Sequence, residues 1–179
     1  MQFNILQTSR LLLREMNPQV YSFLFSTCDD EQLKKQFGLN SDEELEKKKF
    51  NFRNSFTMFN KSFTYFQLLN KENETHIGWC GFHTLYTQHS RAEIGYTIWN
   101  EADRGKGYMK EAFPVILDFG FNNMNLHRIE AFIGPGNTPS LTLVRSFGFT
   151  QEGQLREHYF TNNRFEDSIV FSLLKNDYK

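Results

Sequence analysis

Cysteine is scarce in this sequence, and it holds no long apolar run. The 179 residues include two cysteines, Cys28 and Cys80, which lie far apart with no metal-ligand spacing. The five histidines do not occur as His-x-x-x-His pairs or beside a cysteine. We therefore expect no disulfide framework and no metal site, and we expect both thiols to be reduced. No apolar run approaches the ~20 residues that span a bilayer, so no membrane contact is expected.

The sequence also lacks an excess of charge of either sign. Lys and Arg number 20, and Asp and Glu number 21, which gives a formal net charge of -1. Such a balance supplies no strong field toward nucleic acid, so no nucleic-acid contact is required. The amino terminus shows no basic region followed by an apolar core, and we expect a cytoplasmic protein. Residues 1–179 contain no linker or repeat and suit a single domain.

Apolar periodicity and turn residues predict an α/β layer fold. Asn17-Pro18 starts a helix, Ser41-Asp42-Glu43-Glu44 is a capping box, and the asparagines of Thr161-Asn162-Asn163-Arg164 suit a hairpin turn. The predicted strands are 10–16, 62–69, 76–85, 91–99, 127–133, 154–160 and 165–174. The predicted helices are 18–27, 30–37, one behind the capping box with Leu45, Phe52, Phe56 and Phe59 on one face, one through Ala112 to Phe119, and 139–147.

The stretch Asn100 to Ala112 has the features of an anion-binding turn. It follows the β-prone run Ile94 to Trp99 and leads into a helix, and Gly105 and Gly107 let backbone N–H groups approach a ligand closely. These N–H groups also meet the positive end of the helix dipole, where phosphate binds well. A Walker loop is excluded because Ser or Thr does not follow the Gly-Lys pair, and a dinucleotide fingerprint is excluded because its third glycine is missing.

The loop from Arg104 to Met109 resembles the Arg-x-x-Gly-x-Gly/Ala pyrophosphate loop of the GNAT family of acetyl-CoA-dependent N-acetyltransferases. It departs from that pattern at Met109, where the family has a small residue. Further pieces of the chain occur in the order of the RimJ/RimL branch of this family. These pieces are Arg10 to Arg14, Ala92 to Tyr96, Glu111-Ala112, Asn137 to Ser140 leading to Phe147 to Phe149, Glu152 to Arg156, and Asp167 with Phe171 to Leu174. Together they cover essentially the whole chain.

The resemblance implies a mixed, mostly antiparallel twisted sheet of about six to seven strands with helices on both faces. The strands near 91–99 and 127–133 would splay apart and open a V-shaped slot for acetyl-CoA, with no metal involved. The expected cofactor-binding residues form three groups. They are the strand residues Tyr96, Thr97 and Ile98 for the pantetheine arm, the loop residues Arg104, Gly105, Lys106, Gly107, Tyr108 and Met109 for the diphosphate, and Asn137 and Ser140.

The chemistry implied is acyl transfer from a thioester to an amine, which must be neutral to attack. A protein α-amine with a pKa near 8 is about 10% neutral at pH 7, whereas a lysine amine is below about 0.1% neutral. An α-amine therefore needs only a weak or water-mediated base. Glu93 is the candidate base, and its alternative role is that of a strand carboxylate paired with Arg128 or a lysine.

The leaving thiolate benefits from a proton donor, which many members of the family supply as a tyrosine on the helix after the second splayed strand. The predicted helix 139–147 contains no tyrosine, so Ser140 is the candidate acid. The alternative is that Ser140 and Asn137 only cap this helix. Tyr159 and His158 are the second choices, as acids or as contacts to the acceptor.

Three functions remain open at this point. The first is an N-acetyltransferase whose partner is a primary amine, most plausibly the α-amine of a protein or peptide amino terminus of the ribosomal-protein type. The second is an acetyltransferase for a small amine such as a polyamine, an amino sugar or an antibiotic. The third is a non-catalytic CoA-binding sensor or scaffold. A homodimer is compatible with each of these functions.

Overall fold

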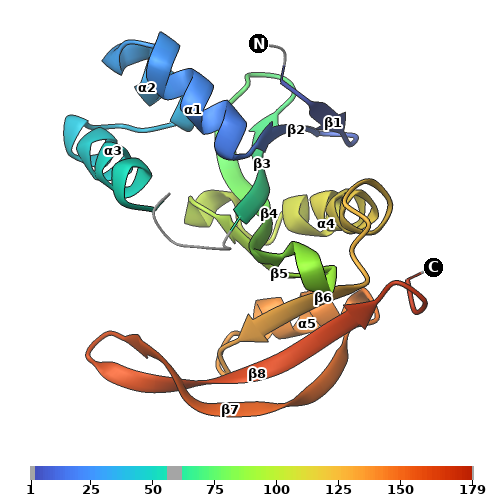
Figure 1. The fold of residues 1–179 in the computed structure, drawn as a ribbon. Helices are drawn as coiled ribbons and strands as arrows, with labels where there is room; N and C mark the ends of the chain where they lie inside the picture. Colours follow the sequence, from blue (N-terminus) through green and yellow to red (C-terminus); the bar gives the residue numbers. More distant parts are fainter. Residues whose placement is uncertain (1–2, 56–61, 179) are drawn as a thin grey trace.

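A computed structural model describes residues 3–55 and 62–178 of the chain and shows one sheet with helices around it (Figure 1). The strands are β1 (Ile5–Gln7), β2 (Leu11–Met16), β3 (Ser62–Asn70), β4 (His76–Tyr86), β5 (Arg91–Ile98), β6 (Arg128–Ile133), β7 (Thr150–Thr161) and β8 (Arg164–Leu174). The α-helices are α1 (Pro18–Thr27), α2 (Asp30–Phe37), α3 (Asp42–Ser55), α4 (Tyr108–Asp118) and α5 (Thr138–Ser146). A π-helical turn, Phe119–Asn123, continues α4.

The sheet has the strand order β1-β2-β3-β4-β5-β6-β8-β7. Every neighbouring pair is antiparallel except β5 and β6, so the predicted mixed, mostly antiparallel α/β fold is confirmed. The sheet has eight strands rather than the expected six to seven. The additional strand, β1, is three residues long, which is too short to show an alternating pattern.

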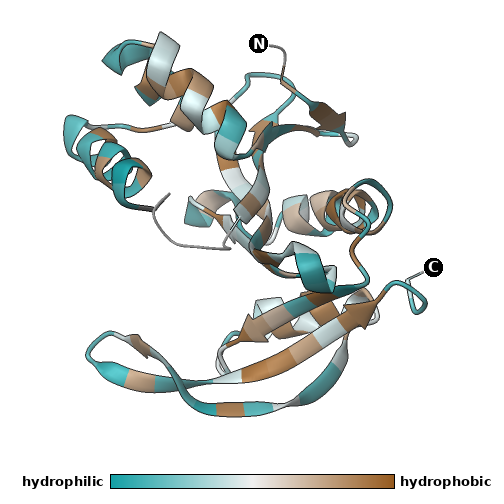
Figure 2. Ribbon diagram, in the orientation of Figure 1, coloured by the Kyte–Doolittle hydropathy of each residue, from teal (hydrophilic) through white to brown (hydrophobic). Residues whose placement is uncertain are grey.

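Helices cover both faces of the sheet, and the side chains of β3 point alternately toward the helices on one face and on the other. Phe66 and Leu68 point into a core cluster that includes residues of α4, whereas Phe63 and Tyr65 pack against a second cluster formed by α1, α2 and α3. Successive side chains of a strand point to opposite faces, so β3 contributes to both clusters. Figure 2 shows apolar residues over β6 and the middle of β8.

Local signals placed the first three helices correctly. Asn17 caps α1, and Gly38 ends α2 in the left-handed conformation with φ 67°. At the capping box of α3, the Ser41 hydroxyl accepts from Glu44 N at 3.2 Å, as expected. The Glu44 carboxylate accepts from Asn40 N at 2.6 Å instead of from Ser41, so the box is shifted by one residue on that side. Of the predicted apolar face of this helix, Leu45 is buried and Phe52 is half-buried, while Phe56 and Phe59 lie outside the described residues.

The two parallel strands separate after a short contact. β5 and β6 pair only at Arg91 with Arg128, Ala92 with Ile129 and Glu93 with Glu130. Beyond Glu93, β5 continues beside β4, and β6 continues beside β8. The two strands therefore diverge and leave the V-shaped slot that the sequence predicted.

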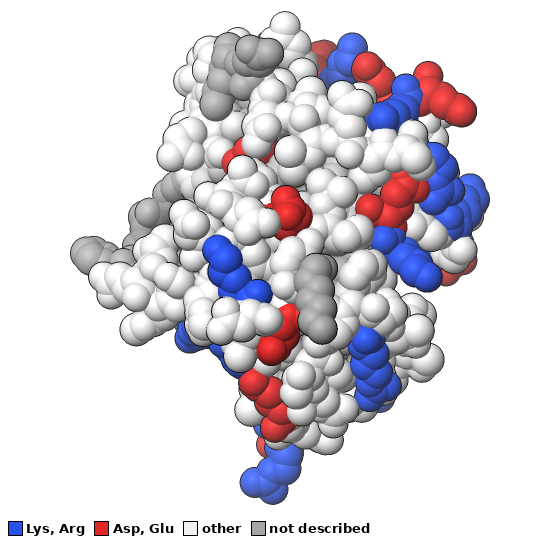
Figure 3. All heavy atoms as spheres, turned by 90° about the vertical axis from the view of Figure 1, so that its right-hand side faces the viewer, with Lys and Arg blue, Asp and Glu red and all other residues white. Residues whose placement is uncertain are grey.

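Charge is mixed on the surface that carries α4, where basic and acidic side chains are interspersed among uncharged ones (Figure 3). This arrangement agrees with the formal net charge of -1. Among the helices of residues 3–55 and 62–178, none combines the length and the apolar character needed to cross a membrane.

Candidate active site

The turn before α4 is built around two glycines with left-handed backbone conformations. Gly105 has φ 74° and Gly107 has φ 82°, a region that residues with a Cβ rarely adopt. Gly107 precedes the first turn of α4 and has no side chain to accept from the helix N–H groups. These groups therefore point out of the positive end of the helix. Residues 104–107 are exposed, so an anion can reach them from solvent.

The turn between β1 and β2 holds this loop in place. The Glu111 carboxylate, in the first turn of α4, accepts from Thr8 Oγ1 at 2.5 Å and from Ser9 Oγ at 3.1 Å. It also accepts from Arg10 N and Arg10 Nε, each at 2.7 Å. Arg10 Nη1 in turn donates to the Lys106 carbonyl oxygen at 3.1 Å. The sequence did not reveal this anchor, because Arg10 and Glu111 lie 101 positions apart.

Replacing Glu111 with glutamine is expected to destabilise the fold and loosen the loop. Burial alone would raise the pKa of Glu111, but hydrogen bonds from Thr8 and Arg10 outweigh it and lower the pKa from 4.5 to about 2. Hydrogen bonds to a charged group contribute about 1.5–3 kcal/mol, and partial exposure reduces this, so we expect a loss of about 1–2 kcal/mol at pH 7.

The pH dependence of the Glu111→Gln effect checks its cause. A carboxyl with a lowered folded-state pKa stabilises the fold above its ordinary pKa and loses that contribution as the pH falls toward 2. Urea unfolding should therefore show a smaller difference between wild type and variant at pH 3 than at pH 7. An equal difference at both pH values would mean that the charge of Glu111 is not the cause.

Tyr96 of β5 and Ser140 of α5 come together at the slot. The Tyr96 ring packs edge-on against Phe113 of α4, with ring centres 5.3 Å apart, and its buried hydroxyl has no hydrogen-bond partner among the described residues. Burial raises the pKa of Tyr96 to about 12, and the Ser140 side chain, which lies near the hydroxyl without forming a well-aligned hydrogen bond, opposes this rise. Asn137 caps α5 by accepting from Ser140 N at 3.2 Å. The cap thus uses the Ser140 backbone and leaves the hydroxyl available.

The edge of β5 that faces the slot is open along its second half. Tyr96 and Thr97 pair with β4 on one side, and the pairing with β6 has ended at Glu93. The Ile98 carbonyl oxygen accepts from Arg104 Nε at 3.3 Å, so this side chain covers the far end of the edge. Because backbone groups alternate between the two sides of a strand and Trp99 N donates to Ile77 on β4, an extended ligand with amide groups meets open backbone first at Tyr96.

Glu93 lies where the two strands separate, directly opposite Glu130. Its side chain is 12% exposed, and its Oε2 lies 3.6 Å from His83 Nδ1 on β4. Burial and, to a lesser extent, the negative charge of Glu130 raise the pKa of Glu93 to about 7. This carboxyl can therefore accept a proton near neutral pH.

The predicted alternative role for Glu93, an ion pair with Arg128, is wrong, because Arg128 binds other carboxylates. Arg128 binds Glu130 at 2.8 Å and also binds Glu152. Arg91 binds Glu130 as well, at 2.5 Å. Both arginines are thus engaged by the carboxylate beside Glu93, and the raised pKa of Glu93 agrees with this arrangement.

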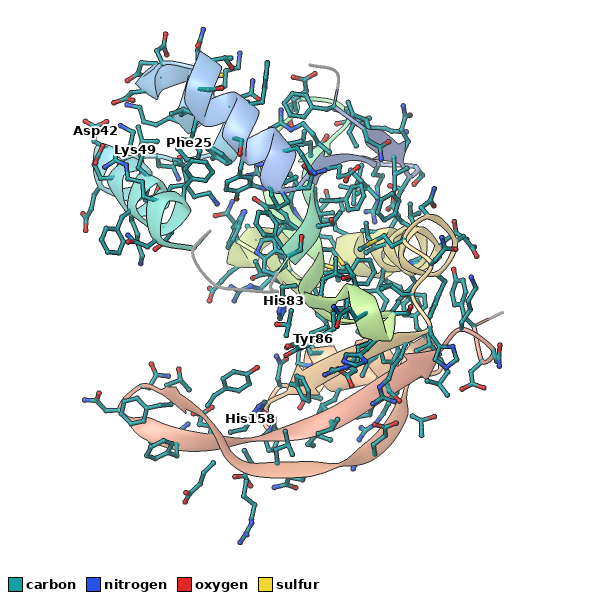
Figure 4. The ribbon with its side chains drawn as sticks, in the orientation of Figure 1. Phe25, Asp42, Lys49, His83, Tyr86 and His158 are labelled. Carbon is teal, nitrogen blue, oxygen red and sulfur yellow. The ribbon has the colours of Figure 1, made fainter. Side chains whose placement is uncertain are left out.

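The hairpin of β7 and β8 faces Glu93 across the opening. Tyr159 is 47% exposed, and its pKa is raised by burial and by the negative charge of Glu93, which places its hydroxyl within electrostatic reach of that carboxylate. The neighbouring His158 contacts Ser168 Oγ through Nδ1 at 3.1 Å. Figure 4 shows His83 and Tyr86 below the upper part of the sheet, on the side that faces His158.

A cavity of about 940 Å³ lies between the helices α2 and α3 and the face of β3 and β4. Trp79 and His83 of β4 form part of its wall. A Cβ at Gly95 of β5 would lie 2.7 Å from His83 Nε2 and 2.9 Å from the Trp79 ring, so both side chains lie across β5 only because position 95 is glycine. His83 touches both the cavity and Glu93, and it therefore connects the cavity to the slot.

Comparison with known proteins gives consistent results. Residues 10–150 match the family model described as "Acetyltransferase (GNAT) domain". The chain is 34% identical over 175 residues to the uncharacterized N-acetyltransferase p20 of Bacillus licheniformis, covering 97% of each chain. It is 29% identical over 90 residues to spermidine N(1)-acetyltransferase of Escherichia coli strain K12, covering 50% of this chain and 48% of that one. The crystal structure of ribosomal-protein-S5-alanine acetyltransferase from Vibrio fischeri is similar in fold, with a TM-score of 0.68, 21% identity and coverage of 98% and 99%.

Proposed function

This chain belongs to the GNAT family of acetyltransferases, and from that premise we propose that it acetylates the α-amine of a protein or peptide amino terminus. The observation that carries the proposal is Glu93, a carboxyl whose pKa is raised to about 7 at the junction of slot and cavity. A base of this strength suits an α-ammonium group with a pKa near 8 better than a lysine ammonium near 10.4, whose proton is held more tightly.

Acetyl-CoA, the acyl donor of this family, supplies the acetyl thioester. The backbone N–H groups of residues 104–109 are suited to hold its diphosphate, and the open edge at Tyr96 is suited to hold its pantetheine arm. Two features fit this ligand, namely the left-handed conformations of Gly105 and Gly107 and the buried, unpartnered hydroxyl of Tyr96. Several charge-assisted hydrogen bonds of about 1.5–3 kcal/mol each suffice for micromolar binding, which needs about 8 kcal/mol.

In the proposed reaction, Glu93 takes a proton from the acceptor ammonium, directly or through water. The freed nitrogen attacks the acetyl carbonyl carbon, so that a C–N bond forms, and the negative oxygen of the intermediate is held by a backbone N–H of β5. The C–S bond then breaks, Ser140 gives its proton to the leaving sulfur, and Ser140 takes back, directly or through water, the proton that the nitrogen must lose to become an amide. Tyr96, whose hydroxyl lies near the Ser140 side chain, is placed to orient that serine.

Replacing Ser140 with alanine is expected to lower kcat by roughly 10²-fold while leaving the Kd of acetyl-CoA within about threefold, because the proton acts in the transition state and not in binding. Tyr96→Phe tests the neighbouring hydroxyl in the same assay, with steady-state kinetics and calorimetry as the measurements. Wild-type turnover in Ser140→Ala would assign the proton to water or to Tyr159 instead.

A polyamine acceptor is the second candidate, and the similarity to spermidine N(1)-acetyltransferase favours it. The two candidates separate in one assay of thiol release from acetyl-CoA. The panel holds peptides with Ala, Ser or Met amino termini, with spermidine and an aminoglycoside beside them. Turnover of the peptides supports the proposal, and turnover of spermidine alone contradicts it. Binding of acetyl-CoA without turnover of any acceptor would favour a non-catalytic sensor.

A further inference from the structure

The cavity beside Glu93 contains a lysine that the proposed reaction does not use. Lys48 projects from α3 into the wall of this cavity. Its Nζ lies 5.1 Å from the centre of the Tyr21 ring and 4.9 Å from the centre of the Phe37 ring. The faces of two aromatic rings attract a cation in this position but cannot neutralise it.

Lys48 differs from its neighbours Lys34 and Lys49 in having no carboxylate partner among the described residues. Lys34 pairs with Glu31 and Asp42, at 2.5 and 2.9 Å. Lys49, the next residue on the same helix, pairs with Asp30 and Glu46 in the same way, at 2.9 and 2.8 Å. Burial lowers the pKa of Lys48 to about 8, as expected for an ammonium group that lacks a counter-ion.

The remainder of the cavity wall has the same character. Aromatic side chains from several elements surround the space, among them Tyr65, Trp79 and Trp99. The charged residues in the wall are three lysines, Lys34, Lys35 and Lys48, against one carboxylate, Glu44. Lys34 is already paired with Glu31 and Asp42, so Lys35 and Lys48 are the cations that remain against Glu44. The cavity therefore presents apolar surface with a small excess of positive charge, to which buried Lys48 contributes, and this charge disfavours a ligand with several ammonium groups.

We propose that Lys48 binds a carboxylate of the acceptor, so that the preferred acceptor is an amino-terminal segment with an acidic residue close behind its α-amine. This inference rests on the proposed function, because it requires the α-amine of the same molecule to reach Glu93. The acceptor carboxylate supplies the counter-ion that Lys48 lacks, and the apolar wall accommodates the neighbouring side chains. Polyamines are disfavoured by the same ammonium group.

The test uses the two tryptophans of the chain, Trp79 and Trp99, as reporters, since both line the cavity. Peptides of equal length carry Asp, Asn or Lys at position 2, 3 or 4 behind a common amino-terminal residue. Quenching of tryptophan fluorescence gives the affinity of each peptide without any need for turnover, and thiol release gives kcat and KM. We expect one position at which Asp binds at least tenfold more tightly than Lys, through KM rather than kcat.

Three variants locate the effect. Lys48→Met keeps the length of the side chain and should abolish the preference for Asp, and Lys48→Glu should reverse it toward Lys peptides and spermidine. Lys47→Met is the matched control, because Lys47 is an exposed residue of the same helix and lies outside the cavity wall. It should bind the peptides as wild type does. Thermal unfolding and the Kd of acetyl-CoA establish that each variant is folded.

Two results would overturn the inference. One is a wild-type protein that shows no preference for Asp at any position, or that prefers Lys peptides or spermidine. The other is a preference for Asp that survives in Lys48→Met. The proposed function is tested by a different outcome. Peptides that bind with the expected preference but release no thiol would contradict the proposed acetylation and leave the role of Lys48 intact. Peptides that are acetylated without any preference for Asp would support the proposed function and contradict the role of Lys48.

Discussion

Replacing Glu93 with glutamine is expected to lower kcat/KM by about 10²- to 10³-fold at pH 7, in line with the contribution of a general base. Glutamine has nearly the same shape but cannot accept the proton of the ammonium group. The defect should shrink as the pH rises above about 8, because an α-amine then loses its proton to solvent unaided. Measurement of kcat/KM between pH 6 and 9.5 for both proteins tests this directly.

The dependence of wild-type kcat/KM on pH should reflect the ionisation of Glu93. Because burial and Glu130 raise the pKa of Glu93 to about 7, the ionised form that the proposed mechanism needs is lost as the pH falls through that value. His83 and Tyr159 also lie near Glu93. Burial lowers the pKa of His83, and burial and the charge of Glu93 raise the pKa of Tyr159, so the two groups titrate away from neutral pH in opposite directions. Glu130→Gln removes a negative charge beside Glu93, so the pH at which kcat/KM falls on the acidic side of the profile should move to a lower value. A Glu93→Gln variant with the wild-type profile would assign the base to His83 or to water.

The elements that the sequence predicted are those with a local physical cause. The helix 18–27 begins at the Asn17 cap and is observed with the same bounds, and the predicted helix 30–37 is observed with Gly38 at its end. At the hairpin turn Asn162 and Asn163 adopt φ 50° and 59°, the left-handed region that asparagine tolerates. Each of these signals lies within a few residues of the feature that it specifies.

The bounds of β7 show where local reasoning fails. The predicted strand began at residue 154, whereas β7 begins at Thr150. Two register shifts, between Gln151 and Gly153 and between Leu155 and Tyr159, interrupt its pairing with β8. Such irregularities break the period of two by which a strand is recognised in a sequence.

The features of the site that the sequence did not reveal all depend on contacts between distant segments. The proximity of Glu93 and His83 follows from the register of β4 against β5. The proximity of Tyr96 and Ser140 depends on how far β5 and β6 diverge. Lys48 lies in the charged run Glu46 to Lys49, a pattern typical of a solvated helix face, and its place in the cavity wall depends on the packing of α3 over the sheet.

Replacing Gly107 with valine is expected to weaken acetyl-CoA binding by well over tenfold. A Cβ at this position would meet no atom closer than Arg10 Nη2 at 3.7 Å, so the effect comes from backbone strain and not from a clash. At φ 82° a β-branched residue is strained by about 1–3 kcal/mol, and the loop relieves the strain by turning N–H groups away from the phosphate position. The loss of one or two charge-assisted hydrogen bonds of about 1.5–3 kcal/mol corresponds to a tenfold or greater rise in Kd.

Isothermal titration calorimetry with acetyl-CoA measures this effect, and Gly148→Val is the matched control. Gly148 has φ 79°, and a Cβ added there would have no atom within 4 Å, but this glycine follows the carboxyl end of α5. The control should lower the thermal stability as Gly107→Val does, because the backbone strain is the same, and it should leave the Kd of acetyl-CoA unchanged. An unchanged Kd in Gly107→Val would show that the diphosphate does not bind at this loop. Equal weakening in both variants would mean that general destabilisation, and not the loss of N–H donors, reduces the affinity.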